Sequence, residues 1–140
     1  MQVMNDYEKA KQLAYRRLEI SKEDLLSAIR NYENEDYRTA NNRAYYSVFH
    51  AISACFALHF KSFKQHSQLI GNFNKDFIHT GIFHIGIAKK IGRLHELRHD
   101  SDYCDFFTVS PEETFEQIET AKEFFTLAEK YIKENVDIKN

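Results

Sequence analysis

The chain has 140 residues, of which 43% are hydrophobic and 14% aromatic, and its formal net charge is −2. This length suits one domain, and so many apolar residues can form a core, which excludes a disordered chain. The nearly neutral charge provides no overall positive field for holding long nucleic acid duplexes. With four glycines and one proline, the chain has too few turn residues for a sheet of short strands, so we expect long helices.

The first half of the chain predicts two helical regions. Residues 1–20 carry apolar side chains at helical spacing. The string that begins at Ser21 resembles a capping box, so either a second helix begins there or one long helix runs through it. A polar turn is expected over residues 31–36. Asp36 is a plausible N-cap for the next helix, which runs from Tyr37 to about Phe60.

The second half predicts three more helices. A basic loop over residues 61–65 precedes a helix from near His66 that ends by Gly81, where glycine suits a C-cap. Another helix runs from about Phe83 to about Arg98 or somewhat beyond. Five helices joined by short loops predict an all-α, up-and-down antiparallel bundle.

The clearest helix start lies near residue 110. Ser110 is suited to cap the helix, Pro111 to occupy its first position, and Glu113 to complete a capping box. The chain is accordingly divided into an N-terminal helical extension, a helical bundle and a frayed C-terminal tail, over residues 1–20, 21–134 and 135–140.

Several classes of site and location are disfavoured by the pattern of residues. The two cysteines and the lack of a leader-like segment predict a reducing cytoplasm. The longest apolar run, Ala44–Phe60, contains too many polar residues for a membrane span. His95 and His99 have a spacing compatible with a metal, but Arg98 stands between them, so we expect no metal and no cofactor.

One face of the second predicted helix carries mostly small residues. Arg43, Ser47, His50, Ala54 and Ala57 share this face, beside a bulky apolar face that we assign to the core. The small residues predict close packing between helices, within the bundle or across a dimer. A sharper alternative is that Arg43 and His50 lie at the edge of a polar cleft.

The string Arg98-His99-Asp100-Ser101-Asp102-Tyr103 ends the fourth predicted helix. The arginine side chain offers five donors in a planar fork that suits phosphate, and Asp102 could hold it through a paired hydrogen bond. The alternative is an ordinary surface ion pair with Tyr103 packed beneath it.

Two strings together resemble the HEPN superfamily, the "higher eukaryotes and prokaryotes nucleotide-binding" domain. They are Asn42-Arg43-Ala44-Tyr45-Tyr46-Ser47-Val48-Phe49-His50-Ala51 and Arg98-x-x-x-Asp102-Tyr103. The resemblance implies an all-α bundle that commonly forms homodimers. It also implies a minimal nucleotidyltransferase as the partner in a toxin–antitoxin pair, and for several members metal-independent cleavage of RNA. This chain departs from the ribonuclease pattern, because Asp102 and Tyr103 stand where the usual histidine would fall.

The resemblance also implies roles for particular residues. Arg98, Asp102 and Tyr103 are the candidate catalytic residues, and Tyr103 is also the candidate for adenylylation by the partner. The candidate residues for binding nucleotide or RNA are Arg43, His50, Lys64 and His66.

Three hypotheses follow from these observations. The chain binds a nucleotide or a nucleotidyltransferase partner, which we favour because the usual histidine is missing. Alternatively, it is a metal-independent ribonuclease toxin that uses Arg98. The third hypothesis is a structural homodimer without a ligand, based on the small residues of the second helix.

Overall fold

The computed structural model describes residues 5–104 and 106–138, and the regular elements of this part of the chain are all helical. The all-α prediction is therefore confirmed. In chain order the elements are α1 (Asp6–Glu33), α2 (Tyr37–Ala57), α3 (His66–Phe73), the π-helical turn η1 (Asn74–Ile78), α4 (Ile85–Tyr103) and α5 (Pro111–Ile138). Residues 1–4 of the predicted extension and 139–140 of the predicted tail lie outside the described residues.

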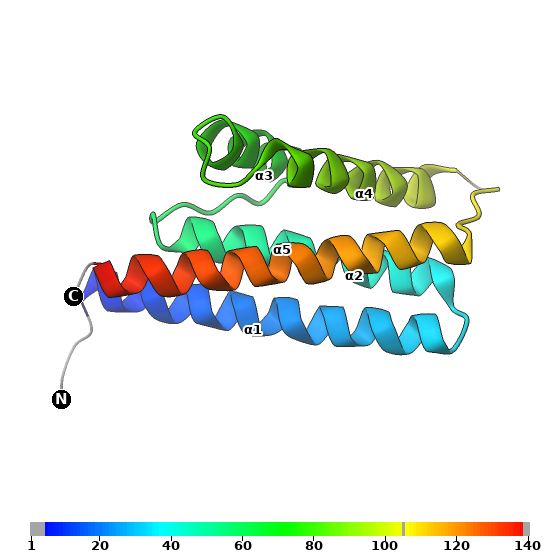
Figure 1. Cartoon of the computed structure of the whole chain (residues 1–140), viewed down its shortest axis with the longest axis horizontal. Coiled ribbons are helices and arrows are strands. Elements are labelled where there is room, and N and C mark those ends of the chain that lie inside the picture. Colours follow the sequence, from blue (N-terminus) through cyan, green and yellow to red (C-terminus); the bar gives the residue numbers. More distant parts are fainter. Residues whose placement is uncertain (1–4, 105, 139–140) are drawn as a thin grey trace.

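The helices form two layers (Figure 1). The long helices α1, α2 and α5 lie side by side, and α3 and α4 cover one side of them. Because α1 and α4 run in one direction and α2 and α5 in the other, consecutive long helices are antiparallel. The start of α1 and the end of α5 meet, since the Tyr7 hydroxyl donates a hydrogen bond of 2.8 Å to the Val136 carbonyl.

The helix α1 runs unbroken through Ser21, which decides between the two alternatives at that position. Ser21 is fully buried, and its hydroxyl donates to the Ser47 carbonyl of α2 over 2.6 Å. The Ser47 hydroxyl donates in return to the Ser21 carbonyl over 2.9 Å. The Ser21 side chain therefore joins two helices, and the small residue Ser47 serves close packing within the bundle.

Aromatic rings fix α3 and η1 against the long helices. Phe73 and Phe83 each lie 5.4 Å from the ring of Phe124 on α5, and Phe77 lies 5.0 Å from the ring of Phe56 on α2. All five rings are buried, and edge-to-face contacts of this kind add to the free energy gained by burying them. This cluster sets the position of α3, whose first residue is His66.

The helix ends that a side chain caps lie where the sequence predicts them. The Asp36 carboxylate accepts from the Thr39 amide over 3.3 Å, and the Ser110 hydroxyl accepts from the Glu113 amide over 3.0 Å. Gly81 adopts a φ of +80°, which glycine tolerates without strain.

Helix ends that depend on packing differ from the sequence-based expectation. The helix α2 ends at Ala57 rather than near Phe60, which adopts a φ of +60°. The third helix changes to π-helical geometry at Asn74 instead of continuing as a single α-helix. The helix α5 continues through Asn135 to Ile138. In the described part of the chain, none of the helices is long and apolar enough to cross a membrane.

Candidate functional site

Arg98 on α4 lies against two tyrosines of α2. Its Nη2 donates a hydrogen bond of 2.8 Å to the Tyr46 hydroxyl, and its guanidinium carbon lies 5.2 Å from the ring centres of both Tyr45 and Tyr46. Its Nη1 donates to the carboxylate of Asp102, one helical turn further on. The side chain retains 23% exposure, so the guanidinium is held in place and still reaches solvent.

The surroundings of Arg98 keep it positively charged. Burial by itself would lower the pKa of Arg98, but the hydrogen bond to Tyr46 and the nearby Asp102 carboxylate raise it overall. Its Nε is buried and has no hydrogen-bond partner among the described residues. A cation anchored in this way is a ready partner for an anionic ligand.

Two histidines contact the same pair of tyrosines. The Nδ1 of His66 lies 2.6 Å from the Tyr45 hydroxyl, and the His66 ring centre lies 4.3 Å from that of Phe49. The His95 ring centre lies 5.9 Å from that of Tyr45. Burial lowers the pKa of both histidines, and the positive charge of Arg98 lowers each further, so both are neutral at pH 7.

A second arginine approaches Tyr46 from α2 itself. The guanidinium carbon of Arg43 lies 4.9 Å from the Tyr46 ring centre, and its Nη1 lies 3.3 Å from Asp24 Oδ1 on α1. The His50 Nδ1 donates to the other oxygen of Asp24 over 2.9 Å. Asp24 therefore positions both Arg43 and His50. We call this group of side chains the Arg98 cluster: Asp24, Arg43, Tyr45, Tyr46, His50, His66, His95, Arg98 and Asp102.

The fold brings some of the site residues predicted from the sequence together and leaves the others apart. Arg43, His50, His66, Arg98 and Asp102 all lie in the Arg98 cluster, although the sequence alone left open whether the residues of the second helix lie near Arg98.

The other two predicted residues lie outside the cluster. Lys64 is exposed on the loop before α3. Tyr103 is 78% exposed, and its ring centre lies 4.7 Å from that of His99. Tyr103 therefore extends from the end of α4 into solvent.

Four members of the cluster were not predicted as site residues. Tyr45 lies on the bulky face that the sequence assigns to the core and is only 3% exposed, but its hydroxyl also belongs to the polar cluster. Tyr46 stood in the aromatic string without an assigned role. Asp24 looked like part of a capping box, and His95 had been considered only for metal binding. No local signal identifies Asp24, because its partners lie 19 and 26 residues further along the chain.

The cluster offers donors to an anion. Arg98 supplies guanidinium donors, the neutral histidines supply ring N–H groups, and Tyr46 adds a hydroxyl. No group of three or more histidine, cysteine or acidic side chains in the described ranges is arranged to hold a metal ion.

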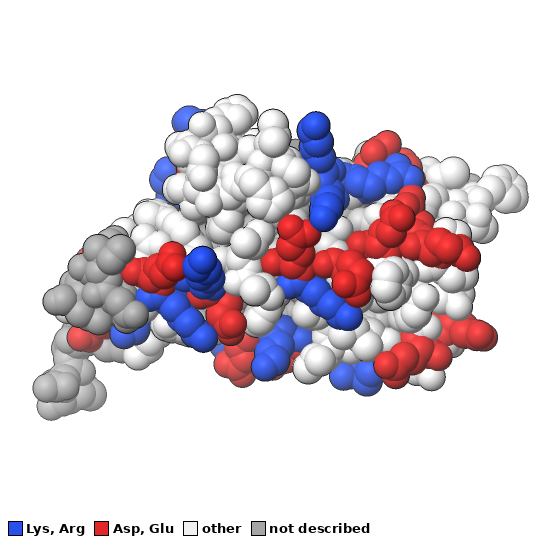
Figure 2. Space-filling view, viewed as in Figure 1, with Lys and Arg blue, Asp and Glu red and all other residues white. Residues whose placement is uncertain are grey.

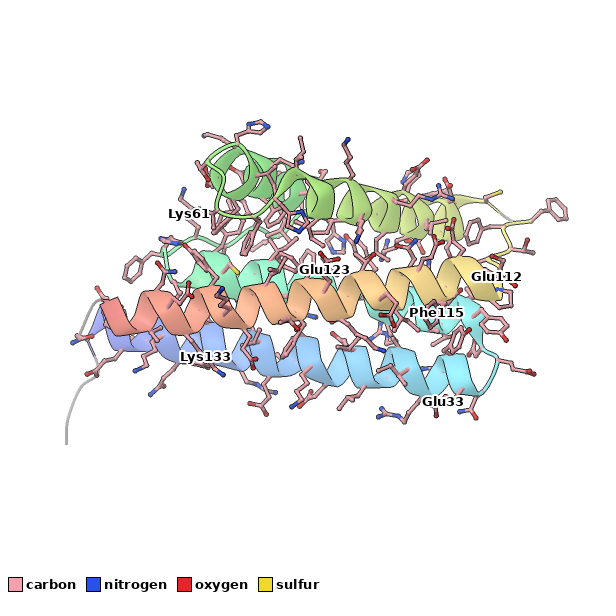
Figure 3. All side chains as sticks on the ribbon, viewed as in Figure 1. Glu33, Lys61, Glu112, Phe115, Glu123 and Lys133 are labelled. Carbon is pink, nitrogen blue, oxygen red and sulfur yellow. The ribbon has the colours of Figure 1, made fainter. Side chains whose placement is uncertain are left out.

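A separate hollow of about 740 Å³ lies between α4 and α5. In Figure 3 the labelled Glu123 points from α5 toward α4, where it accepts from Lys90 over 2.8 Å. Arg93 is paired with Glu113 on the same side. The Arg98 cluster is the stronger candidate for an anion site, because Arg98 is also anchored by the Tyr46 hydroxyl and lies against two tyrosine rings.

Comparison with known proteins agrees with the helical fold and the two sequence strings. A model of the HEPN domain matches residues 14–131. This chain belongs to the HEPN family. The matched residues include every member of the Arg98 cluster, so the cluster is part of the HEPN domain and not of an added segment.

Relatives of this HEPN protein include a UPF0332 protein of Thermotoga maritima, 31% identical over 131 residues that cover 94% of this chain and 97% of the relative. Two proteins of Methanocaldococcus jannaschii are also similar. "Putative toxin MJ0605" is 33% identical over 61% of this chain and 64% of the relative. "Putative toxin MJ0142" is 26% identical over 89% of this chain and 88% of the relative.

Proposed function

We propose that this HEPN protein has a toxin-like role and that its Arg98 cluster binds the phosphate of a nucleotide. Similarity to two proteins whose names read "putative toxin" supports the role. The observation that carries the proposed binding is Arg98 itself, because its guanidinium is anchored by Tyr46 and Asp102 and still reaches solvent. Such an arginine meets a phosphate without first losing much side-chain freedom.

Calorimetry with AMP would test this binding. We expect measurable affinity for the parent protein and a loss of about tenfold or more for Arg98→Ala, because a hydrogen bond to a charged group is lost. Arg16→Ala is the matched control, since Arg16 is an exposed arginine of α1 whose ion pairs in the described part of the chain are with two exposed glutamates. Equal affinity in all three proteins would contradict the proposal.

We further propose a minimal nucleotidyltransferase as the partner and Tyr103 as the residue that it adenylylates. The support is the exposure of Tyr103 and its place at the end of α4, five residues after Arg98. Coexpression with such an enzyme, followed by intact mass measurement, tests this. One added adenylyl group that is absent from Tyr103→Phe is expected, and an adduct that persists in the variant would place the modification elsewhere.

Metal-independent cleavage of RNA is the second candidate function. It is favoured by His66 and His95, whose pKa values the nearby charge of Arg98 lowers, although the usual motif histidine is missing. His50 lies on the same side of the fold, with its ring centre 6.3 Å from that of Tyr46. In this reaction the ribose 2′-hydroxyl attacks the adjacent phosphorus, a base accepts its proton, and an acid protonates the departing 5′-oxygen. Arg98 would stabilise the charge that develops on the phosphate.

A cleavage assay separates the two candidates. Purified protein is incubated with cellular RNA in the presence of a chelator, beside Arg98→Ala. Cleavage that depends on Arg98 would favour the ribonuclease. Intact RNA, together with a Tyr103 that carries no adduct by mass, would favour nucleotide or partner binding.

We also propose that the protein is a cytoplasmic homodimer. Support for the dimer comes from family resemblance and from large apolar rings left at the surface, of which Tyr103 and Phe106 are 78% and 94% exposed. Sedimentation equilibrium at micromolar concentration tests it. A monomer would contradict both this proposal and the third hypothesis, in which the chain is a structural homodimer without a ligand.

A further inference from the structure

We infer that His66 is the second donor of the phosphate site, with its Nε2–H directed to a phosphate oxygen beside Arg98 and its tautomer fixed by Tyr45. This inference rests on the proposed function, because it assumes that the Arg98 cluster binds phosphate. His66 is already a candidate binding residue from the sequence, and the inference adds the atom that binds and the protonation state in which it binds.

The tautomer follows from the burial of Tyr45. Its side chain is 3% exposed, and its hydroxyl is hydrogen-bonded to His66 Nδ1 over 2.6 Å. A buried hydroxyl proton needs an acceptor, and among the described residues Nδ1 of His66 is the one that the geometry offers. Tyr45 therefore donates and Nδ1 accepts. In a neutral imidazole the remaining ring proton must then reside on Nε2.

The ring of His66 is held in one orientation. It stacks on Tyr45 with 5.4 Å between ring centres, lies 4.3 Å from the Phe49 ring, and meets the edge of Tyr46 at 5.9 Å. Within residues 5–104 and 106–138, the Nε2 atom of His66 has no hydrogen-bond partner. It is nevertheless absent from the buried polar atoms that lack a partner, so the atom itself is not buried. We take Nε2–H to face solvent, ready for a ligand.

Arg98 and His66 share the same two supports. The guanidinium carbon lies 5.2 Å from the ring centres of Tyr45 and Tyr46, and the His66 ring lies 5.4 and 5.9 Å from those same rings. The two donors are therefore fixed relative to each other by the tyrosine pair. Because a phosphate presents several acceptor oxygens, one group can accept from both donors at once.

The surroundings keep His66 neutral. Burial lowers its pKa, as do the positive charge of Arg98 and the neighbouring His95 and His50, while Asp102 opposes them. Protonation would also place a proton on Nδ1, so the Tyr45 hydroxyl would have to accept from it, and the buried hydroxyl proton would lose its acceptor. His66 therefore binds phosphate as a neutral hydrogen-bond donor, and Nε2 in this tautomer has no lone pair with which to act as a base.

Nuclear magnetic resonance of the histidine rings tests the tautomer directly. Long-range proton–nitrogen spectra of the full chain at pH 7 distinguish Nε2–H from Nδ1–H rings, and the signals of His66 are those that vanish in His66→Gln. We expect the Nε2–H form. Tyr45→Phe removes the hydroxyl and should give a mixture of tautomers, whereas Tyr131→Phe, which removes a 2.6 Å hydrogen bond to His59 elsewhere, should leave His66 unchanged.

Titration identifies the ligand. Inorganic phosphate, AMP and a short single-stranded oligoribonucleotide are added in turn, and each one that binds should shift the Nε2 signal of His66. His66→Ala should weaken binding by about tenfold, because one hydrogen bond to a charged ligand is lost. His66→Gln should restore part of the affinity, because the glutamine amide also donates. Comparison of the three ligands shows whether the phosphate belongs to a free nucleotide or to RNA.

The outcomes separate this inference from the proposed function. An Nδ1–H tautomer, or ligand binding that depends on Arg98 but leaves the His66 signals and the affinity of His66→Ala unchanged, would overturn the inference and leave the proposed function standing. If none of the three ligands binds, the proposed function fails and the second donor fails with it. Shifts at His66 together with partial rescue by glutamine would support both.

Discussion

Tyr46 is the residue through which the two arginines of the cluster are linked. Its hydroxyl accepts from Arg98 on α4, and its ring lies 4.9 Å from the guanidinium carbon of Arg43. The two contacts use different parts of one side chain. Tyr46 therefore positions Arg98 mainly through its hydroxyl and Arg43 through its ring.

Tyr46→Phe should lower the free energy of unfolding by about 1–2 kcal/mol, since a hydrogen bond to a charged donor in a partly buried site is lost while the ring remains. Urea denaturation measures the change. Tyr103→Phe is the control, because its hydroxyl is on an exposed side chain, and should stay within about 0.5 kcal/mol of the parent. Equal effects of the two substitutions would show that the Arg98–Tyr46 bond contributes nothing to stability.

Stability should fall as the pH drops below about 6.5, the ordinary pKa of histidine in an unfolded chain. Burial and the charge of Arg98 lower the pKa of His66 and His95 in the folded protein, so the unfolded chain takes up their protons first. Their contribution is complete above pH 6.5 and is lost toward the lower folded values. Urea unfolding at several pH values should give a shallower dependence in His66→Gln/His95→Gln; an unchanged slope would contradict the assignment.

At the residue scale, the sequence predicts contacts between residues that are close together along the chain, and it does not predict contacts between residues on different helices. Arg98 and Asp102 are one turn apart on a single helix, so their spacing alone predicted the pair. Asp24 and Arg43 lie on different helices, and their contact depends on how α1 packs against α2. The aromatic string marked the correct helix face, but only the fold brings His66 to Tyr45.

At the scale of the helices, the sequence predicts the helix ends that a local side chain caps, and it does not predict the changes that depend on packing between helices. Ser110 and Asp36 cap their helices as the sequence predicted, because an N-cap needs only residues within the next turn. The change to π-helical geometry at Asn74 lies amid contacts of Phe73 and Phe77 with other elements, which no local pattern reveals. The string that begins at Ser21 resembles a cap because serine is favoured at helix N-termini, but it is also small enough to lie where two helices pack closely, as Ser21 does against α2.

Ser110→Ala should lower the free energy of unfolding by about 1 kcal/mol, because the Glu113 amide at the start of α5 loses its acceptor. Ser110→Asp should retain most of the stability, since a carboxylate also caps and interacts favourably with the helix N-terminus. Thermal unfolding followed by circular dichroism measures both. A destabilised aspartate variant would mean that the serine acts through something other than capping.

At the scale of the whole molecule, the cluster is assembled from four helices. Asp24 comes from α1, the tyrosines and Arg43 from α2, His66 from α3, and Arg98 from α4. The net charge of the whole chain is only −2, and on the one face drawn in Figure 2 Lys and Arg side chains lie among Asp and Glu side chains. We therefore expect attraction for a polyanion to come from the few arginines of the cluster rather than from the net charge of the chain.

This distribution of charge predicts a weak salt dependence for the binding of single-stranded RNA. If Arg98 and Arg43 each neutralise one phosphate, the logarithm of the association constant should fall with the logarithm of salt concentration with a slope of about −1.4. Fluorescence anisotropy of a labelled short oligoribonucleotide between low and moderate salt measures the slope. Arg43→Ala should bring it to about −0.7, because one phosphate contact is removed. A slope several times steeper would contradict binding at the cluster alone and would require a wider basic surface, such as one completed by a second copy of the chain.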